Sequence, residues 1–156
     1  MSAVRAESAA GLTVLDAGEL PGGGAFAATE LIPGRPLGEA ASGLTDRIFD
    51  TFEFVPGATD VSTPPAEVLA DRRGVCQDYT QVFIGACRGL GLPARYVSGY
   101  VNHPGEIATH AWCQVWGGDA VGWVDLDPTH SEFIGDQHIA TAVGRDYHDV
   151  PPNRGL

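Results

Sequence analysis

Hydrophobic positions in the middle of the chain, between Arg73 and Gly91, recur at a helical spacing. From Cys76 onward they follow one another at intervals of mostly three or four residues, at Tyr79, Phe83, Ala86, Cys87 and Leu90. This spacing is typical of one face of an α-helix. Gly89 and Gly91 mark its end, and Pro93 cannot continue a helix. The pattern therefore predicts a helix that begins at Cys76 and places this cysteine in its first turn.

Upstream, the first 43 residues are rich in Ala and Gly and show no sustained period. We expect an irregular segment there, with short extended pieces around residues 12–15 and 25–32. Behind Thr45, a plausible N-cap, the apolar spacing predicts a short helix that reaches about residue 53. Its apolar side chains are those of Leu44, Ile48 and Phe52.

A second short helix is predicted over residues 64–72, which two prolines open. Ser62 or Thr63 is expected to cap this helix, and Val68 and Leu69 are expected to turn inward.

Beyond residue 93 the period changes to the alternation of β-strands. Residues 94–101 are predicted to form a strand, and residues 101–109 a loop. Residues 110–127 are predicted to form a β-hairpin around a Gly-Gly-Asp turn. One more strand is expected over residues 138–143, before an irregular tail. Helices followed by a meander of strands indicate an α+β domain with an antiparallel sheet.

Composition narrows the range of functions. With 156 residues and 44% hydrophobic content, the chain suits one globular domain. No apolar run approaches the length of about 20 residues that a membrane span needs, and no secretory leader is evident at the start. We therefore expect a cytoplasmic protein. The formal charge of −11 argues against nucleic acid or an anionic membrane as a partner.

The three cysteines, Cys76, Cys87 and Cys113, are an odd number in a chain without an evident export signal, which argues against a disulfide framework. No pair of them has the close spacing of a zinc site. The histidines outside the predicted hairpin also show no ligand spacing, so we expect neither a metal nor a cofactor. These histidines are His103, His130, His138 and His148.

Candidate chemistry begins with Cys76, because the first turn of a helix favours a thiolate over a thiol. Alternation along the hairpin places His110 and Cys113 on opposite faces of a strand, so Cys113 is expected to lie in the core. His110 faces Asp127 if Gly-Asp forms the centre of the turn, and Asp125 if Gly-Gly does. Both pairings leave one nitrogen of the imidazole available as a base.

These parts suit a cysteine nucleophile whose proton passes to an imidazole held by an acid. Each residue also has a plain structural reading: a packing cysteine in a helix, a hydrogen-bonded histidine on a strand, and an aspartate that caps the turn before Pro128. Together, Cys76, His110 and an aspartate form a more specific pattern than any of them alone.

Several segments resemble one family in the expected order, namely GVCQDYTQVFIGACRGLGLPARYVSGYV, HAWCQVW, GWVDLDPTH and HIATAVGRDYHDVPP. They closely resemble the transglutaminase-like domain of bacteria and archaea, a branch of the papain-like cysteine enzymes. The resemblance covers about residue 44 to the C-terminus. It implies a catalytic core over residues 44–156, which follows the Gly/Ala-rich segment of residues 1–43.

The resemblance further implies a Cys-His-Asp triad formed by Cys76, His110 and Asp127, and it selects the Gly-Asp turn. The expected fold is a papain-like α+β core, in which the helix that bears the cysteine packs on an antiparallel sheet. The expected activity is acyl transfer or hydrolysis on peptide or glutamine amides through a thioester, with a peptide or protein as the substrate.

Two other readings stay open at this stage. One is a non-catalytic binding or scaffold module that keeps the fold. The other is a metal hydrolase that uses His110 and the aspartates.

Overall fold

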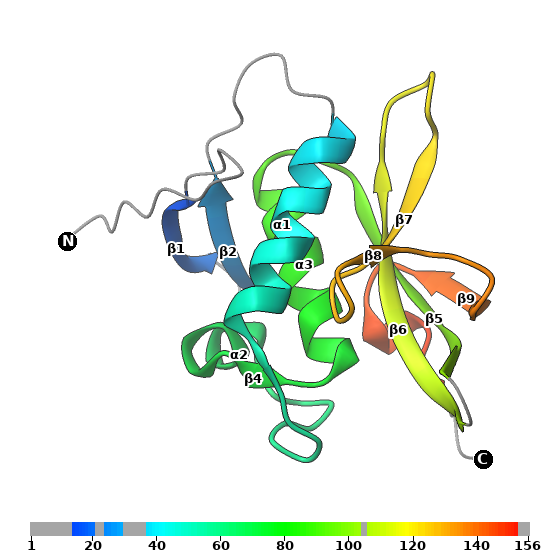
Figure 1. Cartoon of the computed structure of the whole chain (residues 1–156). Helices are drawn as coiled ribbons and strands as arrows, with labels where there is room; N and C mark the ends of the chain where they lie inside the picture. The colour runs from blue at the N-terminus through cyan, green and yellow to red at the C-terminus, as the bar shows by residue number, and fades with distance from the viewer. Residues whose placement is uncertain (1–13, 21–23, 30–36, 104–105, 153–156) are drawn as a thin grey trace.

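The computed structural model describes residues 14–20, 24–29, 37–103 and 106–152, which form an α+β fold (Figure 1). Its helices are α1 (Leu37–Thr51), α2 (Pro65–Asp71), α3 (Cys76–Gly89) and the 3₁₀ turn η1 (Tyr147–Asp149). Its strands are β1 (Val14–Leu20), β2 (Gly24–Thr29), β3 (Glu53–Phe54), β4 (Arg73–Gly74), β5 (Ala94–His103), β6 (Glu106–Trp116), β7 (Trp123–Asp127), β8 (Glu132–Phe133) and β9 (His138–Gly144).

The main sheet has five strands in the order β8-β7-β6-β5-β9, and every neighbouring pair is antiparallel. β1 and β2 form a separate antiparallel hairpin, and β3 and β4 form a short parallel pair. Figure 1 shows the helices on one side of the five-stranded sheet. The predicted α+β class and antiparallel sheet are therefore confirmed.

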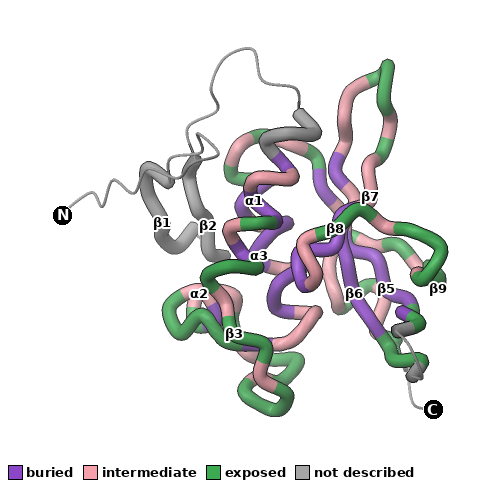
Figure 2. Tube along the Cα trace, in the orientation of Figure 1, coloured by how far each residue is buried: buried purple, intermediate pink, exposed green. Residues whose placement is uncertain are grey.

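The core lies where α1 and α3 pack against the sheet, and Figure 2 shows this region as buried. The predicted apolar face of α3 is buried at Tyr79, Phe83, Ala86 and Cys87. β5 to β7 contribute Tyr96, Ala111, Cys113, Val115 and Leu126 to the same cluster. This packing holds the first turn of α3 against the sheet.

The sheet is strongly curled, so that its face away from the helices is concave. β7 and β9 are three strand intervals apart, which would be about 14 Å in a flat sheet. Nevertheless, Nε2 of His138 on β9 lies only 3.3 Å from Oδ2 of Asp127 on β7. Trp112 fills the hollow and is completely buried. A Cβ on Gly99 would lie 2.5 Å from the Trp112 ring, so this close approach requires glycine.

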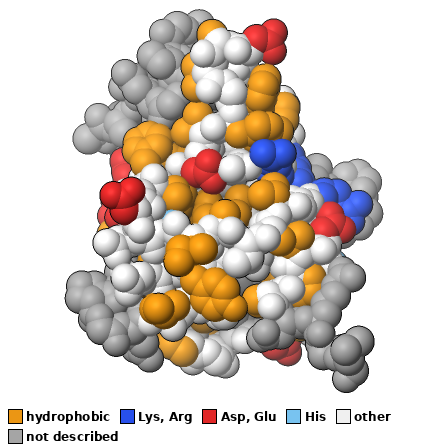
Figure 3. Space-filling view, turned by 90° about the vertical axis from the view of Figure 1, so that its right-hand side faces the viewer, with side chains coloured by type: hydrophobic (Ala, Val, Ile, Leu, Met, Phe, Trp, Pro, Cys, Tyr) orange, Lys and Arg blue, Asp and Glu red, His pale blue; other side chains and the backbone are white. Residues whose placement is uncertain are grey.

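Figure 3 views the molecule from the side of the sheet and shows apolar side chains across the middle of this face. Large apolar side chains of the strands that remain exposed include Tyr100, Ile107, Trp123, Phe133, Ile139 and Val143. Among the described residues, no helix is long and apolar enough to cross a membrane.

Several predicted boundaries are wrong. α1 begins at Leu37, so Thr45 lies inside the helix, where its hydroxyl donates to the carbonyl of Ala41. α2 begins after Pro64, and no side chain caps it. The predicted loop over residues 101–109 belongs largely to β5 and β6.

The predicted extended pieces near the N-terminus fall partly on β1 and β2, and the rest of them lies outside the described residues. The division of the chain at residue 43 stays a prediction.

Candidate active site

Cys76 stands at the start of α3, where a carboxylate fixes the approach of the chain. The backbone N–H of Val75 donates to Oδ2 of Asp78 at 2.7 Å, and the Thr59 hydroxyl donates to the same oxygen at 2.6 Å. Asp78 thereby caps the first turn. A Cβ on Gly74 would lie 2.5 Å from that oxygen, so the residue before this turn must be small. Cys76 itself remains partly exposed.

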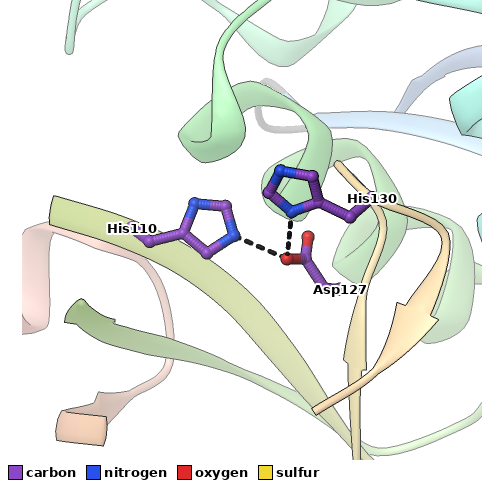
Figure 4. Close-up of side chains that lie close together, drawn as sticks. All are labelled: His110, Asp127 and His130. Carbon is purple, nitrogen blue, oxygen red and sulfur yellow. Dashed lines mark hydrogen bonds and ion pairs between the residues drawn. The ribbon is translucent and has the colours of Figure 1, made fainter. Parts of the chain in front are cut away.

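β6 and β7 bring His110 and Asp127 together (Figure 4). Nε2 of His110 lies 2.6 Å from Oδ2 of Asp127, and both residues are buried. Burial by itself would lower the pKa of His110, but hydrogen bonds with Asp127 and Cys76, and their charges, raise that pKa to about 9. Asp127 occupies Nε2, and the other ring nitrogen, Nδ1, points away from Asp127 in Figure 4. The fold thus brings the three predicted site residues together.

Asp127 is held as a carboxylate although it is completely buried. Burial would raise its pKa, but hydrogen bonds from His110 and His130 hold that pKa well below its usual range. Its second oxygen, Oδ1, accepts the backbone N–H of Thr129 at 2.8 Å. The orientation of the carboxylate is therefore fixed from two sides.

The hairpin between β6 and β7 differs from both predicted turns. Six residues, 117–122, connect the strands, and two glycines of this loop have φ values of 87° and 78°. Asp125 consequently lies opposite Gln114. Asp127 reaches His110 diagonally rather than from directly across. The predicted partner is thus confirmed as a neighbour of His110, but the predicted register is wrong.

The side chain of Asp125 forms hydrogen bonds with residues other than His110. Its Oδ1 accepts the indole N–H of Trp112 at 3.0 Å and the side-chain amide of Gln114 at 2.8 Å. These bonds place the second aspartate of the hairpin inside the curled sheet, where it supports the packing of Trp112.

Two further histidines gather on Asp127. Nδ1 of His130 lies 2.8 Å from Oδ2 of Asp127 (Figure 4). The ring centroids of His130 and His110 are 5.1 Å apart. His138 approaches the same oxygen from β9. Sequence reasoning missed both histidines. The short spacing of His130 from Asp127 is a local signal, whereas the contact of His138 depends on the curl of the sheet.

A cavity of about 360 Å³ opens between Cys76 and His110. Its remaining lining consists mainly of apolar and hydroxyl-bearing residues, namely Phe54, Val101, Ala108, Thr109, Thr129 and His130. A substrate carbonyl in this cavity would have access to both the sulfur and the imidazole.

The other two cysteines are unsuited to reaction. Cys87 and Cys113 are buried, and all three cysteines of the chain are free thiols. Burial raises the pKa of Cys87 to about 12 and the pKa of Cys113 well above its usual value. The Cys113 thiol donates to the carbonyl of Leu126 at 3.1 Å, which confirms its predicted place in the core.

Potential metal ligands also gather at Asp127. His110 Nε2, Asp127 Oδ2 and His130 Nδ1 lie within 4.8 Å of one another. Asp127, Glu132 and His138 form a second group of this kind.

A cysteine at the start of a helix, set against a His-Asp pair on an antiparallel sheet, defines a papain-like α+β domain. The chain belongs to the transglutaminase-like superfamily, whose model matches residues 27–128. An uncharacterized protein of Mycobacterium tuberculosis is 42% identical to it over 143 residues. The matched region covers 84% of this chain and 46% of that relative, so the chain spans less than half the length of this curated relative.

Solved structures show the same fold. A candidate cysteine protease from Cytophaga hutchinsonii matches with a TM-score of 0.65 and 30% identity, over 71% of this chain and 37% of that one. Calcium-bound LapG of Legionella pneumophila matches with a TM-score of 0.57 and 14% identity, over 71% of this chain and 66% of that one. At 14% identity the likeness to LapG concerns the fold alone.

Proposed function

We propose that the protein is a cysteine-dependent enzyme that transfers or hydrolyses acyl groups of peptide or glutamine amides through a thioester. The observation that carries this proposal is the buried imidazole of His110, whose Nε2 lies 2.6 Å from Asp127 and which lines one cavity together with its other partner, Cys76. A histidine held in this way can take the proton of a thiol and keep the resulting imidazolium oriented.

In the proposed reaction the sulfur of Cys76 attacks the carbonyl carbon of the amide. The C–N bond breaks, and His110 gives its proton to the departing amine. The acyl group then remains on Cys76 as a thioester. An amine or a water molecule attacks this thioester, loses a proton to His110, and releases the product and the free thiolate.

The negative charge on the carbonyl oxygen during attack requires hydrogen-bond donors. The backbone N–H of Cys76 is a candidate, because the first N–H groups of a helix have no partner within the helix. The solved structure of a candidate cysteine protease with this fold supports amide chemistry, and it favours a peptide or protein substrate.

The proposal is tested by trapping the thioester with a labelled primary amine in the presence of a peptide library. The chain contains no lysine, so apart from its N-terminus it cannot compete for the acyl group. We expect a covalent acyl adduct on Cys76 and labelled peptide products, both of which disappear in Cys76→Ala. Hydrolysed peptides without label would show that water is the acceptor.

His110→Ala should abolish turnover, whereas His148→Ala, which removes an exposed histidine, should retain it. Absence of any adduct and any product across the library would contradict the proposal and favour a binding or scaffold module. Activity that chelators remove and iodoacetamide spares would favour a metal hydrolase.

A further inference from the structure

Three imidazole nitrogens lie around Asp127 Oδ2, although the orientation of His110 requires only one of these contacts. His110 Nε2 lies at 2.6 Å, His130 Nδ1 at 2.8 Å and His138 Nε2 at 3.3 Å from this single oxygen. A carboxylate oxygen has only two lone pairs in its plane, and Oδ1 is already held by a backbone N–H. Two imidazoles from β6 and from the segment after β7 thus converge closely on one oxygen.

Two imidazoles and one carboxylate are a donor set that suits divalent transition metals. In tetrahedral zinc sites the ligand atoms lie about 2.0–2.1 Å from the ion and therefore about 3.4 Å from one another. The two short N–O distances would need to widen by about 0.6–0.8 Å to admit the ion. The side chain of His130 is 31% exposed, so it has room for such a shift. Asp127 is held by burial, so the pair of His110 and Asp127 can widen only if the His110 ring turns toward the cavity that it lines.

The cavity beside Cys76 provides a path for an ion, because His110 and His130 both line it. Thr129 lies in the same lining and is 92% buried, since its exposed fraction is 8%. Its hydroxyl has no hydrogen-bond partner among the described residues. A water molecule bound to the metal on the cavity side would give this hydroxyl a partner.

We propose that Zn²⁺ or a similar divalent transition metal binds reversibly to His110 Nε2, Asp127 Oδ2 and His130 Nδ1, and that the metal-bound form is inactive. The binding half of this proposal stands on the geometry alone, while the inactivation half rests on the proposed function.

The inactivation follows from the protons of His110. In the active form the ring carries protons on both nitrogens when it faces the thiolate of Cys76. Binding of the ion at Nε2 releases that proton to solvent and leaves one proton on Nδ1. The ring is then no longer an imidazolium, so it cannot efficiently protonate the departing amine.

Binding is tested by titrating ZnCl₂ into Cys76→Ala in a calorimeter, since this variant cannot bind zinc through the thiolate. We expect one ion per chain. Adding His130→Gln should weaken the affinity by at least about 10–100-fold, the scale on which loss of even an outer-shell partner of a metal ligand acts. Adding His148→Gln instead, which removes an exposed histidine, should leave the affinity unchanged.

The ligand atoms are identified on Cys76→Ala itself by ¹⁵N NMR of its histidine rings. Zinc should shift His110 Nε2 and His130 Nδ1, whether or not the double variant folds. No binding to Cys76→Ala, or binding that shifts neither of these nitrogens, would overturn the proposal.

In the wild-type protein, zinc should reduce turnover and a chelator should restore it. Zinc binding without any loss of measurable turnover would overturn the inactivation half. A protein that binds zinc at these atoms but shows no turnover at all would instead count against the proposed function.

Discussion

Asp127 is the residue on which the site depends, because one buried carboxylate holds two imidazoles at the cavity that contains Cys76. Removing water from a carboxylate is costly unless charged or hydrogen-bonding partners replace it. Here the partners are the rings of His110 and His130 and a backbone N–H. The same bonds that keep Asp127 ionised therefore orient the proposed base.

Replacing Asp127 with Asn should reduce turnover by about 10⁴-fold, the scale found when the acid of a catalytic triad becomes an amide. The amide carries no charge to hold an imidazolium and can favour the wrong tautomer of His110. Steady-state kinetics on a peptide amide measure the loss. Asp125→Asn is the matched control, because that carboxylate bonds Trp112 and Gln114 instead. Equal losses in the two variants would contradict the role given to Asp127.

At the scale of elements, the start of α3 fixes the position of Cys76. Asp78 accepts bonds from Val75 and Thr59, and Gly74 leaves space for its side chain. The helix thus begins at a defined residue, which holds the sulfur at the mouth of the cavity.

Asp78→Ala should destabilise the protein by about 1–3 kcal/mol, because it removes a cap and leaves two partly buried donors without this partner. Urea unfolding of the variant and the wild-type protein measures the difference. Asp71→Ala, at an exposed position in α2, should change stability by less than about 0.5 kcal/mol. A similar small effect in both variants would show that Asp78 does not hold the helix start.

The sequence allowed α3 to be predicted well, because glycine and proline mark its end and its apolar spacing is regular. The hairpin register could not be predicted, since the glycine-rich loop has six residues where a two-residue turn was expected. The contact of His138 with Asp127 escaped prediction for a different reason. It depends on the curl of the sheet, which brings β9 toward β7 and leaves no periodic signal. The contact of His130 is local, since this residue follows Asp127 by three positions.

At the scale of the whole molecule, the curled sheet and the helices meet at this one buried polar cluster. His110 and Asp127 each have a pKa in the folded protein that differs from the value expected for the unfolded chain. The stability of the fold is therefore linked to pH through these two residues.

For His110 the folded pKa of about 9 lies above the ordinary value of 6.5, so its stabilising effect is present below pH 6.5 and is lost as pH rises toward 9. For Asp127 the folded pKa is depressed, so its effect is present above the ordinary value of 3.8 and is lost as pH falls below it. Urea unfolding across this range should show a decline on both sides. His110→Ala should remove the alkaline decline, and its persistence in that variant would assign it to another group.

The most direct test of the account is the rate of iodoacetamide alkylation at each cysteine, followed by mass spectrometry across the pH range. We predict rapid modification of Cys76 alone near neutral pH, a change in its rate near pH 9 as His110 loses its proton, and loss of both features in His110→Ala. Cys87 and Cys113 should stay unmodified in the folded protein, because they are buried. Equal reactivity of all three cysteines, or a rate at Cys76 that His110→Ala leaves unchanged, would contradict the central claim.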